Sequence, residues 1–392
     1  MKKIVFFTGN RAEFGLQSPV IDEIIKRRNF DYKLIISGSH LDSGFGKTIN
    51  EINIKKYKIL GKVKINKIQK IEYTPNNISL IIKDVTKLLK KYSPDIFVAF
   101  ADRFETFGTV IAASMMNICV AHVEGGDITN GGTFDDNIRH AITKLSHIHF
   151  TSTDEAKKIV LKLGEEKRRI FNVGFTGLDN IKNKNLGDFF YLKKKYKIDI
   201  EKQTILFTYH PLTSNFLNNI ESIRGPIQFL KKNEHKFNII LTFPNNDLGS
   251  NEIIKYINKN IKKNKSIQVF KSLGGYDYLS FMKLCLKNSR ALIVMGNSSS
   301  GIKETMSFKC PVVNIGSRQK GRTKGCNVIN VNANISEIEK AIKKINSDND
   351  FIKKIRSSKN IYGDGKSAKR IVDIISKIKL DSTLINKLHY EK

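Results

Sequence analysis

Short apolar runs alternate with helical segments along the whole chain, and this alternation constrains the fold more than any other feature. Helical periodicity fills the gaps between the early runs, at Ile78–Lys91 and at Phe104–Met116, and the second of these segments is apolar on nearly all faces. Buried strands that alternate with helices predict a parallel sheet covered on both faces. The apolar runs of this first series are Ile4–Phe7, Lys33–Ile36, Ile96–Phe100, Ile118–Ala121 and Ile148–Phe150.

A second series of the same kind follows the polar stretch Lys182–Lys202, with helical periodicity at Asp277–Lys287 and a tail helix at Ser367–Ile378. The 392 residues suit two domains of ordinary size. We therefore predict an α/β chain of two Rossmann-like doubly wound domains that face a cleft. Residues 1–181 form the first, 203–364 the second, and 365–392 a helix and tail that pack back on the first. The apolar runs of the second series are Ile205–Thr208, Phe237–Thr242, Ser266–Phe270, Ala291–Val294 and Pro311–Ile315.

The formal charge of +31 raises the question of a nucleic-acid partner. A binding footprint would cluster, whereas lysine is spread along the chain in short runs such as Lys193–Lys195. No base-stacking aromatic signature accompanies these runs. The pattern favours a solvated basic surface over a nucleic-acid site, and that surface can still attract an anionic substrate.

The four cysteines lack CxxC spacing, which argues against zinc and redox motifs. The N-terminal apolar run is too short for a signal-peptide core, and no apolar stretch reaches 18 residues. We therefore expect reduced thiols, a cytoplasmic location and no membrane partner.

Acidic residues follow two of the predicted strands, and another opens the helical segment that comes next. Asp102 lies between a strand and a helix, Glu124 precedes two glycines, and Asp135 begins a helical segment. The alternative interpretations are a helix N-cap for Asp102, a charged turn for Glu124 and a dipole-favoured first turn for Asp135. Several carboxylates at one sheet edge can instead have separated pKa values and divide acid and base roles.

Features suited to anions also follow strands. The turn Gly9–Gly15 carries Arg11, a bidentate phosphate donor, and His210 follows a strand of the second series. The loop Gly296–Glu304 combines serine hydroxyls with the start of a helix, an arrangement that binds phosphate. The alternative interpretations are a plain turn for Gly9–Gly15, a structural role for His210 and a serine-rich capping turn for the loop.

Taken in order, these motifs resemble the hydrolysing UDP-N-acetylglucosamine 2-epimerases, from Lys3 to about Val331. The resemblance implies a fold similar to glycosyltransferase type B. It implies catalytic carboxylates at Asp102, Glu124 and Asp135. It also implies nucleotide contacts from Arg11, Arg103, His210, Asn245, Ser298, Ser299, Glu304 and Arg318. Many members have Thr where Asn10 stands, and Glu where Asp127 stands.

The resemblance implies a reaction without cofactor or metal, in which UDP-N-acetylglucosamine gives N-acetylmannosamine and UDP through a 2-acetamidoglycal. The main alternative substrate is UDP-2,4-diacetamido-2,4,6-trideoxyglucose, of the legionaminic acid pathway. The glycine-rich stretch 125–132 suggests room for its second acetamide. A non-hydrolysing epimerase, a type B glycosyltransferase and a nucleic-acid binder are further alternatives. We expect a homo-oligomer, either a dimer or a tetramer.

Overall fold

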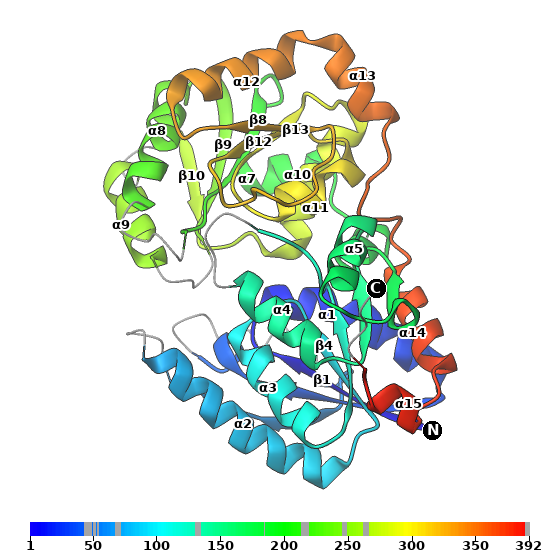
Figure 1. Ribbon diagram of the computed structural model, residues 1–392. Coiled ribbons are helices and arrows are strands. Elements are labelled where there is room, and N and C mark those ends of the chain that lie inside the picture. The colour runs from blue at the N-terminus through cyan, green and yellow to red at the C-terminus, as the bar shows by residue number, and fades with distance from the viewer. Residues whose placement is uncertain are drawn as a thin grey trace. The chain divides into compact units, whose positions relative to one another are not determined.

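The computed structural model describes residues 1–42, 49, 52, 55–66, 72–129, 135–183, 185–212, 219–244, 249–261 and 266–388, with the backbone alone at residues 182 and 183. The chain divides into two compact units (Figure 1). The first unit combines Met1–Asp127, Asp135–Lys182 and Tyr362–Lys392, and the second contains Asn183–Ile361.

The first unit is built on a parallel sheet with strand order β3-β2-β1-β4-β5-β6-β7. Its strands are β1 (Lys2–Thr8), β2 (Phe30–Ile36), β3 (Ile59–Lys62), β4 (Ile96–Phe100), β5 (Cys119–Val123), β6 (Ile148–Thr151) and β7 (Ile170–Asn172). Its helices are α1 (Arg11–Arg27), α2 (Tyr73–Tyr92), α3 (Phe104–Met115), α4 (Asp135–Leu145), α5 (Asp154–Lys162), α6 (Gly177–Asn183), α14 (Ser367–Lys377) and α15 (Ser382–Ile385).

The alternation of side chains along β1 shows why helices cover both faces of this sheet. Ile4 and Phe6 join a core formed with α1 and α14, whereas Val5 and Phe7 join a second core formed with α2 and α3. Because both sets are fully buried, the strand reads as a continuous apolar run. Figure 1 shows α14, near the end of the chain, beside α1.

The second unit repeats this architecture around a parallel sheet with strand order β10-β9-β8-β11-β12-β13. Its strands are β8 (Gln203–Thr208), β9 (Phe237–Thr242), β10 (Ile267–Phe270), β11 (Leu292–Gly296), β12 (Val312–Ile315) and β13 (Val328–Val331). Its helices are α7 (Phe189–Tyr196), α8 (Asn219–Lys232), α9 (Ser250–Ile261), α10 (Gly274–Lys287), α11 (Ser300–Lys303), α12 (Ile335–Ser347) and α13 (Asn349–Ser357).

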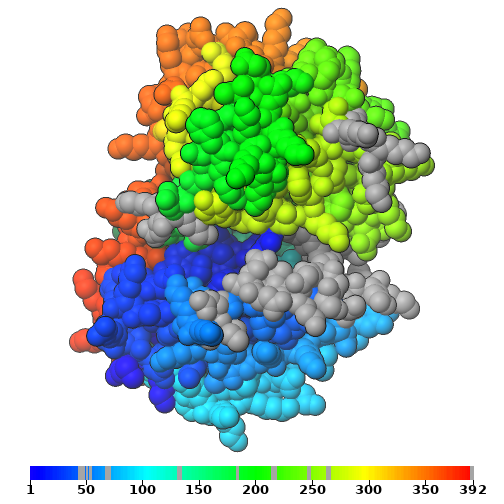
Figure 2. Space-filling model, turned by 180° about the vertical axis from the view of Figure 1, so that it is seen from behind, coloured from blue at the N-terminus to red at the C-terminus, as the bar shows by residue number. Residues whose placement is uncertain are grey.

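The predicted fold class is confirmed, and each of the ten predicted strands is present. The sequence did not predict β3, β7 and β13, which are three of the four outermost strands; the fourth, β10, was predicted. The polar stretch Lys182–Lys202 also contains a helix, α7, which lies at the surface of the second unit (Figure 2, green) and buries Leu192 and Tyr196. None of the helices within the described residues is long and apolar enough to cross a membrane.

Side chains from other elements fix both ends of α14. The buried Asp179 carboxylate accepts hydrogen bonds from the amides of Ser367 and Ala368, at 3.1 and 3.0 Å, where the helix begins. At the other end, Lys2 Nζ donates to the carbonyls of Ile375, Ser376 and Ile378. These bonds satisfy backbone groups that a helix leaves without partners at its ends.

Candidate functional site

Three adjacent strands of the first unit end beside residues that the sequence singled out. β1, β4 and β5 are neighbours in one parallel sheet, so their carboxyl ends lie along the same edge. Arg11 follows β1, Asp102 and Arg103 follow β4, and Glu124 follows β5. This edge is where open parallel sheets bind ligands.

The turn after β4 does not use Asp102 as a helix cap. Ala101 has a positive φ of 58°, and the N-cap of α3 is Arg103. The Asp102 carboxylate instead accepts a hydrogen bond from Nη2 of Arg139, on α4. The capping interpretation of Asp102 is therefore wrong.

Arg139 is the residue that brings the acidic motifs together, and the sequence assigned it no role. Its side chain is 2% exposed, and its Nη1 lies 2.6 Å from both Asp136 Oδ1 and the Asp127 carbonyl. Burial opposes the guanidinium charge, but the surrounding aspartates outweigh it and hold the Arg139 pKa above its usual range. The i, i+3 spacing from Asp136 was visible in the sequence, whereas the bond to Asp102 depends on tertiary structure.

Asp135 and Asp136 form the first turn of α4, as predicted. Asp136 pairs with Arg139, so one of the two carboxylates is committed to an ion pair. The Asp135 side chain is partly exposed at the start of the helix. An acidic residue in this position is also favoured by the helix dipole.

Glu124 has a backbone conformation that residues other than glycine rarely adopt. Its φ is 70°, its side chain is buried, and its amide donates to the Phe150 carbonyl at 2.9 Å. A left-handed conformation costs a residue other than glycine about 1–2 kcal/mol. Such strain is characteristic of functional sites and motivates a functional hypothesis for Glu124.

The glycines after Glu124 are required by the protein itself. A Cβ on Gly125 would lie 3.0 Å from His122 Nδ1 and from Thr143 Oγ1. On Gly126, whose φ is 82°, it would lie 2.2 Å from the Ala156 carbonyl oxygen. At these two positions the idea that missing side chains leave room for a substrate acetamide is wrong, because protein atoms fill the space. Gly131 and Gly132 lie outside the described residues.

His122, the fourth residue of β5, supports the turn that precedes Asp102. Its Nε2 lies 2.8 Å from the Ala101 carbonyl and its Nδ1 lies 3.1 Å from Thr143 Oγ1. Burial lowers the His122 pKa to about 3, so the ring is neutral at pH 7. Because a carbonyl only accepts, Nε2 carries the proton, and the ring fixes the strained Ala101 backbone.

In the second unit, Asn297 organises residues from three strand ends. Its side chain accepts from the His210 amide at 2.6 Å and donates to the His210 carbonyl at 2.8 Å. Its own carbonyl accepts from Arg318 Nη1 at 3.2 Å and from Gln319 Nε2 at 2.9 Å. The structure therefore brings His210 and Arg318 to the start of the serine loop, and Asn297 is a second residue without a predicted role.

The serine loop follows β11 and leads into the short helix α11. Ser299 occupies the N-cap position without a side-chain capping bond, so the capping interpretation fails for this residue. Ser298 Oγ lies 3.4 Å from the Ser300 amide, and Ser300 donates to the Glu304 carboxylate. Asn245, the remaining predicted nucleotide contact, lies outside the described residues.

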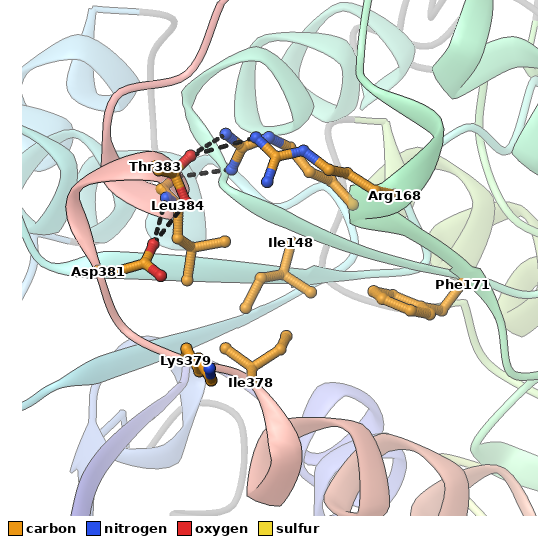
Figure 3. Close-up of a pocket in the computed structure, with 9 residues that line it drawn as sticks. Ile148, Arg168, Phe171, Ile378, Lys379, Asp381, Thr383 and Leu384 are labelled. Carbon is orange, nitrogen blue, oxygen red and sulfur yellow. Dashed lines mark hydrogen bonds between the residues drawn. The ribbon is translucent and has the colours of Figure 1, made fainter.

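A pocket of about 210 Å³ lies elsewhere in the first unit (Figure 3). It is lined by Ile148 at the amino end of β6, by Arg168 and Phe171, and by tail residues including Ile378. None of the predicted site residues contributes to it. The predicted residues that the structure describes follow the carboxyl ends of strands or open a helix, so this pocket is a separate feature.

Among the described residues, no group of three or more histidine, cysteine or acidic side chains is placed to hold a metal ion. The carboxylates of Asp102 and Asp136 are bound to Arg139 instead.

Comparison with known proteins supports a family assignment. Residues 22–376 match the family model described as UDP-N-acetylglucosamine 2-epimerase. The chain is 32% identical to the UDP-N,N'-diacetylbacillosamine 2-epimerase (hydrolyzing) of Legionella pneumophila, over 99% of both chains. It is 36% identical to the GDP/UDP-N,N'-diacetylbacillosamine 2-epimerase (hydrolyzing) of Campylobacter jejuni, over 88% of both. The crystal structure of UDP-GlcNAc 2-epimerase from Neisseria meningitidis shares the fold, with a TM-score of 0.81, 21% identity and coverage of 96% and 100%.

Proposed function

Since the chain belongs to the UDP-N-acetylglucosamine 2-epimerase family, we propose that it is a hydrolysing 2-epimerase of a UDP-linked 2-acetamido sugar. The observation that carries this proposal is the pair of carboxylates after adjacent strands, Asp102 after β4 and Glu124 after β5. Two relatives that match most of the chain have the word "hydrolyzing" in their names, which supports the proposal that the nucleotide is released by hydrolysis.

The reaction divides into an elimination and a hydration. A carboxylate removes the proton from sugar C2 while the C1–O bond breaks and UDP leaves, which gives a 2-acetamidoglycal. Water then adds its hydroxyl group to C1, and a proton returns to C2 on the opposite face. The balanced products are UDP and the free 2-epimer, and each proton transfer needs a positioned acid or base.

Asp102, Glu124 and Asp135 are the groups proposed for these proton transfers. Arg139 contacts Asp102 directly and Asp136 beside Asp135, so its charge stabilises carboxylates on two elements at once. This pairing favours Asp102 as an orienting or charge-bearing group. Glu124, whose strained backbone fixes its direction, is the candidate for the base at C2.

The diphosphate and ribose are assigned to Arg11, Arg103, His210, Asn245, Ser298, Ser299, Glu304 and Arg318. The leaving diphosphate gains negative charge as C1–O breaks, and arginine side chains with serine hydroxyls stabilise that charge. In the second unit, Asn297 accepts hydrogen bonds from the His210 amide and from Arg318 Nη1, so the His210 backbone and the Arg318 side chain are oriented before a ligand binds. Such preorganisation reduces the cost of binding.

Two substrates fit the comparisons. The description of the family model supports UDP-N-acetylglucosamine. The names of the Legionella and Campylobacter relatives support the UDP-linked 2,4-diacetamido-2,4,6-trideoxy sugar, and their match over most of the chain favours this substrate. A site built to hydrogen-bond the hydroxyls at C4 and C6 would reject a sugar that lacks them.

The test is an assay of both nucleotide sugars without any acceptor, with products separated by chromatography and kcat/KM compared. We expect UDP and a free 2-epimer, with higher kcat/KM for the diacetamido sugar. A released nucleotide sugar with C2 inverted would identify a non-hydrolysing epimerase. Folded Asp102→Asn, Glu124→Gln and Asp135→Asn variants should each lose roughly 100-fold or more of the turnover. Normal turnover in any one would remove that residue from the mechanism.

A further inference from the structure

Glu13, in the first turn of α1, is a buried carboxylate that the proposed reaction does not use. Its side chain is 4% exposed. One oxygen, Oε2, accepts from the Gly9 amide at 2.6 Å, and the other, Oε1, accepts from Thr106 Oγ1 at 2.7 Å. Gly9 belongs to the turn after β1, and Thr106 to the first turn of α3. One carboxylate thus joins two crossover connections of the sheet.

The start of α1 does not need this arrangement. Asn10 already caps the helix, because its Oδ1 accepts the Glu13 amide at 2.9 Å. Helix α12 begins with the same pair, Asn334 and Glu337, and there the glutamate stays local. Glu337 accepts from the Asn332 amide at 2.7 Å and from nearby side-chain amides, and it is only partly buried. Capping alone therefore explains Glu337, but it does not explain the burial of Glu13.

The surroundings of Glu13 connect it to the residues assigned to the nucleotide. Glu105 is also buried, lies near Glu13, and accepts from Arg103 Nε at 3.3 Å. On the other side of the turn, Ser39 Oγ donates to the Gly9 carbonyl at 3.2 Å. The hydroxyl of Thr8 lies 3.0 Å from His40 Nε2. The turn that carries Arg11 is thus held by the turn after β2 on one side and by Glu13 on the other.

We propose that Glu13 is a positioning residue that locks the turn carrying Arg11 to the turn carrying Arg103, so that both arginines reach the anionic part of the substrate together. Burial raises the Glu13 pKa to about 7, although the bonds from Gly9 and Thr106 and the charge of Arg103 oppose that rise. Burial of a carboxylate costs free energy, and the link that Glu13 makes between two elements explains why it is buried here. Its significance for binding rests on the proposed function.

The link itself is tested by hydrogen exchange without any ligand. In Glu13→Ala, amides of residues 101–107 should exchange about tenfold faster or more, although the mutation lies on another element. The matched control Glu337→Ala removes an equivalent first-turn glutamate and should leave residues 101–107 unchanged. Faster exchange confined to residues 9–14 would overturn the proposal. Thr106→Val cuts the same link from the other side and should speed exchange at residues 9–11, so the test survives if Glu13→Ala does not fold.

The effect on binding is measured by calorimetry with UDP. Glu13→Ala should raise the Kd for UDP about tenfold, since each arginine loses its fixed position. Glu13→Gln should recover most of the affinity, because its amide oxygen accepts the Gly9 amide and its NH2 group donates to Thr106 Oγ1. Equal losses in both variants would contradict positioning. If the wild-type protein does not bind UDP, the proposed function fails, whereas the exchange experiment still decides the link.

Discussion

Ala101 and Glu124 end adjacent strands with left-handed backbone conformations, at φ of 58° and 70°. Glycine would adopt either conformation without strain. Ala101 directly precedes Asp102, and Glu124 is itself one of the proposed catalytic carboxylates. Surrounding hydrogen bonds, such as the one from His122 to the Ala101 carbonyl, maintain the strained backbone. The sequence could not predict these conformations, because they result from packing rather than from local preference.

This strain gives a prediction about stability. Glu124→Gly should be about 1 kcal/mol more stable than Glu124→Ala, because only alanine keeps the cost of the left-handed backbone. In a strand or helix the order would be reversed. Thermal or urea unfolding of the two variants measures the difference. A more stable alanine variant would show that position 124 is not strained in solution.

Glu13 gives a prediction about pH. Its pKa is about 7 in the folded protein and about 4.5 in the unfolded chain. Between these values the folded state holds a proton that the unfolded state has lost, so stability falls as pH rises from 4.5 to 7. The wild type should therefore lose stability relative to Glu13→Gln across this window, on the order of 3 kcal/mol. Unfolding free energies at pH 5 and pH 7.5 test this, and a constant difference would contradict it.

At the scale of elements, every central strand was predictable, whereas only one of the four edge strands, β10, was predicted. β1, β4 and β11 are buried on both faces and stand out as apolar runs. β3 and β13 lie at sheet edges and carry charged or polar side chains such as Lys62 and Asn330, so their pairing depends on a neighbour rather than on composition. The same limit applied to the site: the positions of the proposed residues after strands were predictable, whereas the contacts of Arg139 and Asn297, which connect elements, were not.

Two neighbouring arginines, Arg168 and Arg169, both bind the C-terminal tail but differ in burial. Arg169 is buried and donates to the carbonyls of Leu384 at 2.6 Å and Thr383 at 2.8 Å. Arg168 shares Glu166 and Thr383 as partners but is 59% exposed (Figure 3). Arg169→Met should therefore destabilise the protein by ~2 kcal/mol or more, and Arg168→Met by less than ~0.5 kcal/mol. Urea unfolding measures the stability of both variants. Similar losses of stability would show that the burial of Arg169 does not strengthen its contacts with the tail.

The serine loop gives the corresponding prediction for ligand binding. Replacing both Ser298 and Ser299 by alanine should weaken UDP binding by about 0.5–1.5 kcal/mol for each hydrogen bond lost. The matched control is Ser347→Ala, at the exposed end of α12, which should leave the affinity unchanged. Calorimetry showing the same UDP affinity in the double variant would assign the loop to structure alone.

At the scale of the whole molecule, the alternation of strands and helices was sufficient to predict two parallel α/β units. That alternation is dictated by burial, since a parallel sheet must be covered on both faces. The charge of +31 carried no comparable information, because lysine is distributed over the chain. What the sequence could not supply is the contact network, in which a buried Arg139 joins Asp102 to α4 and a buried Glu13 joins α1 to α3.

The most direct test of the proposed reaction is an NMR experiment in D₂O with the UDP-linked 2-acetamido sugar as the sole substrate. Deprotonation at C2 and reprotonation from solvent predict a free sugar with inverted C2 that carries deuterium at that carbon, together with one equivalent of UDP. A free sugar that keeps both its original C2 configuration and its C2 proton would indicate simple hydrolysis. That result would contradict the account, as would a nucleotide sugar that remains intact.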